Sequence, residues 1–223
     1  MSRLFVTASG TEIGKTFVTC ALIRQLEAAG RTAAALKPVV TGYNPDAPEA
    51  SDAGELLAAL GRPVDATAVA EISPWRFAEA LSPDMAAERE NRSIPFAELV
   101  EFCAERPEAD VTLIEGIGGI MVPLDETHTV LDWVTTLAVP ALVVVGGYLG
   151  TLSHTLTAIG ILRAHGQEIA GIVVNESPEQ PVTLKETART IARFVRPTPV
   201  SVLARLPSYE EAPDLLPLIT PDP

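Results

Sequence analysis

The segment Leu4-Phe5-Val6-Thr7-Ala8-Ser9-Gly10-Thr11-Glu12-Ile13-Gly14-Lys15-Thr16 decides the fold of this chain. Its apolar start predicts a buried strand, and the residues from Thr16 to about Ala29 have the apolar spacing of a helix. A strand that passes through a glycine-containing turn into a helix beginning Gly-Lys-Thr forms a phosphate cradle, because the backbone N–H groups there point at the anion. The lysine then reaches the β- and γ-phosphates, and the threonine hydroxyl binds Mg²⁺. We therefore predict a nucleotide-phosphate loop.

This loop departs from the standard pattern, which has its first glycine at the position of Ser9. Glycines stand at positions 10 and 14 instead. Taken alone, Gly14-Lys15-Thr16 also fits an ordinary helix start. The preceding strand and the following helix favour the phosphate loop.

Composition sets limits on the class of protein. The chain has 223 residues, 47% of them hydrophobic, and a net charge of −13, which suits one α/β domain spanning residues 1–223. The acidic charge argues against nucleic acid as a partner, because phosphate binding needs a cationic surface. No apolar run approaches the ~20 residues of a membrane span, and no signal sequence is recognisable, so we expect a cytoplasmic protein without a membrane partner. Cys20 and Cys103 are expected to be free thiols in a reducing compartment.

A second strand is predicted from Thr32 to Val39, after Gly30 ends the first helix. Two apolar strands joined by one helix indicate a parallel pair with a right-handed crossover. Lys37 lies near the end of this strand, so it would project into the crevice where open α/β sheets bind ligands. The alternative is an exposed loop lysine. The apolar neighbours of Lys37 favour a functional role.

A third strand, from Asp110 to Glu115, ends in an acid and continues into the glycine-rich turn Gly116-Ile117-Gly118-Gly119. P-loop NTPases place an Asp or Glu on a neighbouring strand, where it helps to hold Mg²⁺. A hard dication with oxygen ligands and phosphate suits this position. The alternative for Glu115 is a strand-end acid that faces water.

The remaining pattern alternates strands and helices. Ser51-Asp52 begins a short predicted helix that ends near Leu60, and by spacing alone Asp52 is its N-cap. The segment 72–81 is irregular. Further helices are predicted from Ser82-Pro83 onward, from Ile94-Pro95 to Arg106, at 151–165 and at 182–195, and further strands at 141–145, 169–174 and 200–203. The pattern predicts an α/β fold with a doubly wound, mainly parallel sheet and flanking helices. The histidines at 128, 154 and 165 have no metal-ligand spacing and are expected to be structural or exposed.

Several short motifs together resemble the dethiobiotin synthetase family. They are Thr11-Glu12-Ile13-Gly14-Lys15-Thr16, Leu36-Lys37-Pro38-Val39, Ser51-Asp52, Phe77-Ala78-Glu79 with Ser82-Pro83, Glu115-Gly116-Ile117-Gly118-Gly119 and Leu149-Gly150. They occur in the family's order along nearly the whole chain, which is more specific than the phosphate loop alone. The resemblance implies a P-loop NTPase fold, a homodimer and an ATP-dependent, Mg²⁺-dependent ligase of biotin synthesis. Such an enzyme closes a cyclic urea on 7,8-diaminononanoate with CO2.

The resemblance also implies roles for individual residues, with Lys15 and Lys37 as the catalytic pair. The nucleotide would be bound by Gly10, Thr11, Glu12, Ile13, Gly14, Lys15, Thr16, Phe17, Glu115, Asn175, Leu206 and Pro207. Mg²⁺ would be held by Thr16, Asp52 and Glu115, which replaces the N-cap interpretation of Asp52. The substrate would be bound by Thr11, Lys37, Thr41, Gly118, Leu149, Gly150, Thr151, Leu152 and Ser153. The turn 149–153 would take the far carboxylate of the substrate across the dimer interface, and Asn175 would contact the adenine edge.

The chain also departs from the family. The family usually begins its loop with Gly-Thr-Asp-Thr, whereas this chain has Ala8-Ser9-Gly10-Thr11. Because glycine tolerates positive φ, the change at Ala8 predicts altered backbone angles, with activity retained. Asp84 stands where relatives have a histidine, and Thr41 replaces a common serine.

The alternative function is a partitioning-type ATPase, or another nucleotide-binding module, of the same superfamily. A partitioning ATPase carries a signature lysine at the position of Gly10.

Overall fold

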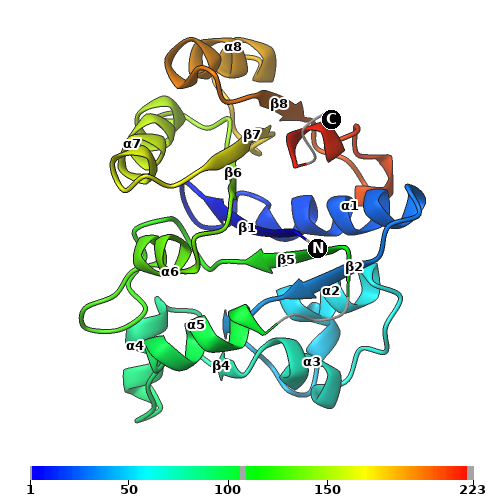
Figure 1. The fold of residues 1–223 in the computed structure, drawn as a ribbon, viewed down its shortest axis with the longest axis vertical. Coiled ribbons are helices and arrows are strands. Elements are labelled where there is room, and N and C mark those ends of the chain that lie inside the picture. Colours follow the sequence, from blue (N-terminus) through cyan, green and yellow to red (C-terminus); the bar gives the residue numbers. More distant parts are fainter. Residues whose placement is uncertain (1, 106–108, 220–223) are drawn as a thin grey trace.

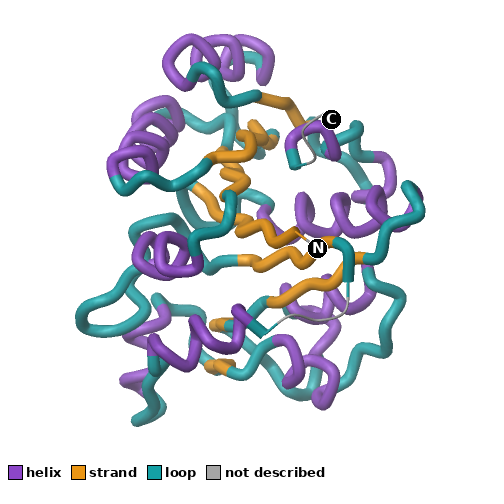
Figure 2. The backbone as a smooth tube through the Cα atoms, in the orientation of Figure 1, coloured by secondary structure: helices purple, strands orange, loops and turns teal. Residues whose placement is uncertain are grey.

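A parallel sheet forms the centre of the molecule. The computed structural model describes residues 2–105 and 109–219. Within them a six-stranded sheet has the order β2-β5-β1-β6-β7-β8, with every neighbouring pair parallel. Its strands are β1 (Ser2–Ala8), β2 (Ala33–Leu36), β5 (Val111–Glu115), β6 (Ala141–Val145), β7 (Ile169–Asn175) and β8 (Val200–Leu203). Helices lie on both faces of this sheet (Figures 1 and 2). The predicted doubly wound α/β fold is confirmed.

The helices divide between the two faces of the sheet. On one face lie α1 (Lys15–Ala28), α2 (Asp52–Ala59) and α3 (Ala66–Ile72), and on the other lie α5 (Phe96–Ala104), α6 (Val130–Leu137) and α7 (Thr151–Ala164) (Figure 1). The remaining elements are α4 (Pro83–Arg89), α8 (Leu184–Val195), the 3-10 turns η1 (Pro48–Ala50), η2 (Tyr209–Glu211) and η3 (Leu216–Leu218), and the paired strands β3 (Val39–Thr41) and β4 (Trp75–Phe77). Among the described residues, no helix combines the length and apolar character that crossing a bilayer requires.

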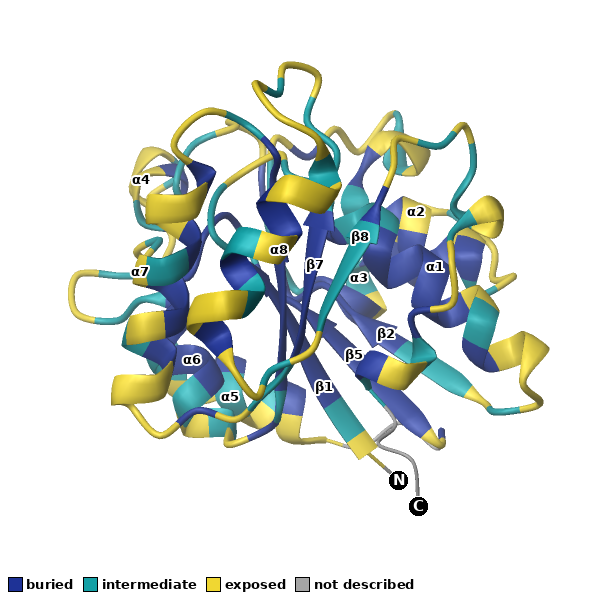
Figure 3. Ribbon diagram, turned by 90° about the horizontal axis from the view of Figure 1, so that it is seen from above, coloured by how far each residue is buried: buried dark blue, intermediate teal, exposed yellow. Residues whose placement is uncertain are grey.

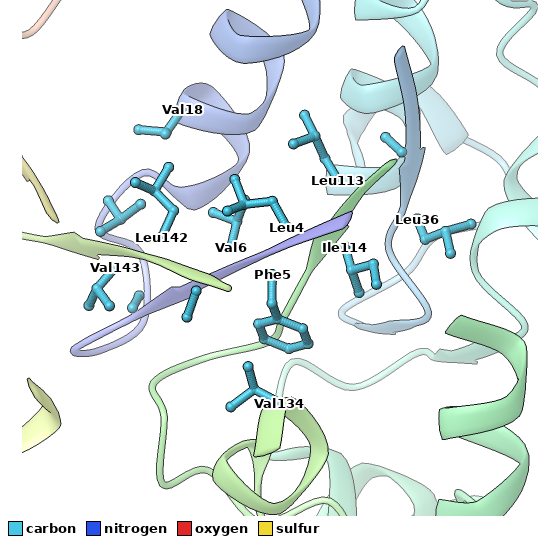
Figure 4. Close-up of a cluster of buried hydrophobic side chains, with 14 of the residues drawn as sticks. Leu4, Phe5, Val6, Val18, Leu36, Leu113, Ile114, Val134, Leu142 and Val143 are labelled. Atoms are coloured by element: carbon cyan, nitrogen blue, oxygen red, sulfur yellow. The ribbon is translucent and has the colours of Figure 1, made fainter. Parts of the chain in front are cut away.

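The core fixes β1 in the middle of the sheet. Alternate β1 side chains point to opposite faces, as the period of a strand requires. Leu4 and Val6 face the α1 side with Val18, whereas Phe5 points toward Val134 of α6 (Figure 4). Strands β5 and β6 and most of β1 are buried, the edge strand β8 is mostly intermediate, and exposed residues concentrate in loops and on the outer sides of helices (Figure 3). Because β1 is held on both faces, the loop that follows it starts from a fixed point at the carboxyl edge of the sheet.

The strand predicted from Thr32 to Val39 is shorter in the structure, and it does not pair with the first strand as predicted. Strand β2 ends at Leu36, and β5 lies between β1 and β2. The ladder stops there because Pro38 has no N–H to donate. The chain continues as β3, which pairs with β4 in a separate two-stranded sheet. Lys37 therefore lies between two strands, beside the end of β5.

Other boundaries need smaller corrections. Ser51, and not Asp52, is the N-cap of α2, since its hydroxyl accepts the Gly54 N–H at 3.1 Å. Helix α4 begins at Pro83, as predicted. The predicted end of the next helix at Arg106 lies outside the described residues. Helices α3 and α6 are absent from the sequence-based prediction, and the irregular segment 72–81 contains β4.

Candidate active site

The phosphate loop connects the end of β1 to Lys15, the first residue of α1. Two loop residues have left-handed backbone angles, Glu12 with φ 56° and Gly14 with φ 90°. Ala8 is instead the last residue of β1, paired with Val144 of β6. The loop therefore places no left-handed residue at position 8, and the altered angles predicted from Ala8 do not occur at that residue.

Asn175 ties the end of β7 to this loop. Its side-chain nitrogen donates to the Ile13 carbonyl at 3.0 Å. A Cβ atom added to Gly14 would lie 2.1 Å from the same nitrogen. Gly14 is thus required both by its positive φ and by the close approach of Asn175.

Lys15 is buried beneath the loop. Its ammonium donates to the carbonyl of Gly118, in the turn after β5, at 2.9 Å. Burial, followed by repulsion from the Lys37 charge, lowers the pKa of Lys15 to about 8. An anion placed beside this buried ammonium would stabilise its charged form strongly, because the surrounding protein screens charge poorly.

Lys37 forms ion pairs with both of the carboxylates that are predicted to bind the metal. Its ammonium lies 2.6 Å from Glu115 Oε1 and 2.7 Å from Asp52 Oδ2, and it also donates to the Gly116 carbonyl at 3.0 Å. Lys37 and Glu115 are 1% and 0% exposed. Burial alone would lower the pKa of Lys37, but attraction to Glu115 and Asp52 raises it overall. Lys37 is therefore an ion-paired cation at the end of β5.

The hydroxyl of Thr16 completes this cluster. It donates to Glu115 Oε1 at 2.8 Å. Burial would raise the pKa of Asp52, but the charge and hydrogen bond of Lys37 lower it, so Asp52 is ionised at neutral pH. Two carboxylates and one hydroxyl thus converge beside the phosphate loop.

A cavity of about 680 Å³ opens above these groups. Its lining contains most of the predicted site residues, namely Thr11, Glu12, Ile13, Gly14, Lys15, Thr16, Phe17, Lys37, Thr41, Asp52 and Gly118. It also contains Glu55, Ile117, Val122 and the segment 80–83. The sequence analysis does not include Glu55 among the site residues, because it belongs to no recognisable motif. Its spacing of three residues from Asp52 places both on the same face of a helix, which was the one available signal.

A second cavity, of about 340 Å³, adjoins the first. It is lined by Asn175, Glu176, Ser177, Pro178, Ala204, Arg205 and Leu206, and it shares Glu12, Ile13, Gly14 and Phe17 with the first. Asn175 and Leu206 are thereby brought to the loop from two distant segments. Pro207 follows Leu206 but is outside this lining.

The turn 149–153 lies apart from both cavities. Leu149 is 85% exposed, and Gly150 has φ 97° at the start of α7. Thr151 is buried, and its hydroxyl already donates to the Gly146 carbonyl at 2.6 Å. Of the predicted substrate contacts, the structure therefore brings together Thr11, Lys37, Thr41 and Gly118, but not this turn.

Comparison with known proteins supplies the family context. A model described as an AAA domain matches residues 2–213. The ATP-dependent dethiobiotin synthetase BioD of Acidiphilium cryptum is 51% identical over 205 residues, covering 91% of this chain and 92% of that protein. The protein of the same name from Methylobacterium nodulans is 48% identical, covering 86% and 89%.

Solved structures agree on the fold. The MinD cell division protein of Aquifex aeolicus has a TM-score of 0.55 at 16% identity, covering 93% of this chain and 84% of that one. The MinD of Pyrococcus horikoshii, complexed with Mg-ADP, has a TM-score of 0.52 at 18% identity, covering 93% and 83%. At such identities the likeness shows the fold alone.

Proposed function

This chain belongs to the ATP-dependent dethiobiotin synthetases, an AAA-domain family, and from this premise we propose the reaction that its site performs. The enzyme is an ATP-dependent ligase of biotin biosynthesis. In the proposed reaction, 7,8-diaminononanoate, CO2 and ATP give dethiobiotin, ADP and phosphate. The observation that carries the proposal is the placement of Lys15 and Lys37 along one cavity beside the phosphate loop, with the buried Glu115 ion-paired to Lys37.

The reaction needs three bond-forming steps. One amine adds to CO2 and loses a proton, which gives a carbamate. A carbamate oxygen then attacks the γ-phosphorus and breaks the bond to the bridging oxygen, which leaves with ADP. The second amine attacks the carbonyl carbon of this carbamic-phosphoric anhydride and expels phosphate, which closes the cyclic urea. No enzyme nucleophile is required.

The two lysines supply positive charge where oxygens accumulate negative charge. We assign Lys15 to the β- and γ-phosphates, since it is the first residue of the helix that follows the phosphate loop. We assign Lys37, with Thr11 and Thr41, to the carbamate, because all three line the same cavity. Fixing the carbamate oxygen against the γ-phosphate by such contacts lowers the barrier mainly through positioning and charge stabilisation.

The residues present suit a bound Mg²⁺. The described residues hold no cluster of three or more His, Cys, Asp or Glu suited to a metal. They do supply the Asp52 and Glu115 carboxylates and the Thr16 hydroxyl, and Glu115 Oε2 is buried without a hydrogen-bond partner among them. One or two carboxylates combined with substrate phosphates are the usual ligands of Mg²⁺. When bound there, the ion would neutralise charge on the β- and γ-phosphates.

The second cavity suits the nucleotide base. Asn175 lines it and offers an amide edge, while Leu206 provides an apolar wall. We therefore assign Asn175 to the adenine edge and the chain at Leu206-Pro207 to the base pocket.

We also propose a homodimer. The turn 149–153 lines neither cavity, yet Leu149 is 85% exposed. A second copy would bring this turn to the partner's cavity, where it would take the far carboxylate of the diamine. A cytoplasmic location is supported by Cys20 and Cys103, which are buried free thiols of the kind that persist in a reducing compartment.

The proposed function is tested by phosphate release from ATP with 7,8-diaminononanoate and bicarbonate, against a control without diamine. We expect release to depend strictly on the diamine and dethiobiotin to form in equal amount. A partitioning-type ATPase would release phosphate without the diamine, and that result would overturn the proposal.

A further inference from the structure

Tyr148 lies in the connection from β6 to α7 and has no role in the reaction as described so far. Its hydroxyl is 2.8 Å from Nδ1 of His154, in the first turn of α7. Its ring packs against Gly146, where an added Cβ would lie 2.6 Å from the ring carbon Cδ1. The ring therefore has a defined position that depends on a glycine at 146.

The same hydroxyl also approaches the phosphate loop. A Cβ added to Gly10 would lie 3.9 Å from it, an ordinary van der Waals distance. Tyr148 thus stands between Gly10, where this chain departs from its family's usual loop, and His154 on α7. The Tyr148 hydroxyl therefore lies close to both the phosphate loop and the first turn of α7.

Hydrogen bonds hold the start of the segment between β6 and α7, whereas its middle is exposed. The Ser177 hydroxyl accepts the Gly147 N–H at 2.9 Å, and the Thr151 hydroxyl donates to the Gly146 carbonyl. Leu149 and Gly150, between these anchors, are exposed. The Tyr148–His154 hydrogen bond spans this exposed part and joins its two ends.

We propose that Tyr148 is a positioning residue for the far carboxylate of the diamine. Through His154 it orders the turn 149–153 before the substrate arrives, so that less entropy is lost on binding. This inference rests on the proposed function, which assigns the turn to that carboxylate. Tyr148 touches no reacting atom in this proposal, so its loss should alter the KM for the diamine and not the chemical step.

The test compares steady-state kinetics of Tyr148→Phe, His154→Ala and the double variant with the wild type. Tyr148→Phe keeps the ring packing and loses the hydrogen bond, so we expect the KM for the diamine to rise about three- to tenfold. The kcat, the KM for ATP and the Tm should stay at wild-type values. Because both single changes remove one interaction, the double variant should be no worse than either. His165→Ala, at the other end of α7, is the matched control and should leave every parameter unchanged.

A second substrate separates positioning from general damage. With the same diamine lacking its carboxylate, wild type and Tyr148→Phe should have equal KM values. An unchanged KM for the full diamine, additive effects in the double variant, or a lower Tm with a lower kcat would each overturn the inference. If the wild type itself releases phosphate without any diamine, the proposed function fails instead.

Discussion

Lys15 and Lys37 carry the same charge in opposite surroundings. The ammonium of Lys15 contacts a neutral carbonyl, and burial lowers its pKa to about 8. The ammonium of Lys37 contacts two carboxylates, which raise its pKa. The Lys15 ammonium thus has no carboxylate within ion-pair distance among the described residues, whereas the Lys37 ammonium is paired with two. Substitution of Lys15 should therefore affect mainly activity, whereas substitution of Lys37 should also affect stability.

Replacing Lys15 should remove activity without harming the fold. In Lys15→Ala we expect turnover to fall by at least about a hundredfold, since a preorganised charge on the transferring phosphate is lost. The Tm should not fall, because no buried ion pair is broken. Phosphate release and thermal melting measure the two effects, and undiminished diamine-dependent turnover would remove Lys15 from its assigned role.

Replacing Lys37 should weaken the fold as well. In Lys37→Met the buried Glu115 loses its cation, so we expect unfolding to become easier by about 3 kcal/mol, measured by denaturant titration. Mg²⁺ should restore part of this loss, because it would supply positive charge to the same carboxylates. Lys185→Met, on the exposed side of α8, is the control and should change little. Equal stability of Lys37→Met and wild type would contradict this ion-pair account.

The carboxylates themselves predict a metal dependence. In Glu115→Gln and Asp52→Asn a charged oxygen ligand becomes a neutral one, so the Mg²⁺ concentration needed for half-maximal turnover should rise about tenfold or more. Asp84→Asn, which alters an acid outside the proposed metal ligands, should leave the Mg²⁺ titration unchanged. A residue whose amide variant keeps the wild-type titration would not be a metal ligand.

At the scale of elements, α6 illustrates why sequence patterns alone miss some helices. Its sequence, Val130–Leu137, is rich in β-branched residues, which have only modest helix propensity. A capping box defines its start, since Thr129 and Asp132 hydrogen-bond each other's backbone N–H groups. Packing then holds it, because the rings of Trp133 and Phe5 meet edge to face with centroids 4.8 Å apart. Helix α6 thereby supports the strand that leads into the phosphate loop.

The capping box should have a measurable, pH-dependent effect. Asp132→Ala should lower the free energy of unfolding by about 1 kcal/mol at pH 7. Hydrogen bonds from Thr129 lower the pKa of Asp132 in the folded state. The stabilisation is therefore fully present above the unfolded pKa of about 3.9 and is lost as the pH falls through the lower folded value. Denaturant titrations from pH 7 to pH 3 should show the two proteins converging only at the acid end; a constant difference would contradict this origin.

At the scale of the whole molecule, exposed apolar side chains support the proposed dimer. Leu149 and Leu152, both in the turn 149–153 that we assign to the interface, are 85% and 37% exposed. Since a charge is costly to bury in an apolar interface, Leu149→Asp should give a monomer in light scattering after size-exclusion chromatography. Diamine turnover should fall at least about tenfold while ATP still binds, because the phosphate loop is within one chain. Phe194→Asp, 63% exposed on α8, is the control. A fully active monomeric variant would refute the shared site.

Much of the fold and of the nucleotide site can be predicted from the sequence. Strand β1, the turn with Gly14 and the start of α1 follow from short-range preferences that act within about ten residues. The resemblance to the dethiobiotin synthetases adds Asp52 and Asn175 as candidates, and the structure shows that each lines one of the two cavities. Glu55 and Tyr148 were not predicted: Glu55 is marked only by its helical spacing from Asp52, and the motif that follows Tyr148 does not include it.

The sequence by itself determined where the phosphate loop begins and ends, because glycine angles, strand period and helix spacing are local properties of the chain. Only the tertiary structure decided which charges meet there. Lys37 and Glu115, 78 residues apart, form a buried ion pair because β5 is inserted between β1 and β2. Asn175 reaches Ile13 across 162 residues for a similar reason. Strand order depends on how all the helices cover both faces of the sheet at once, and no short segment contains that information.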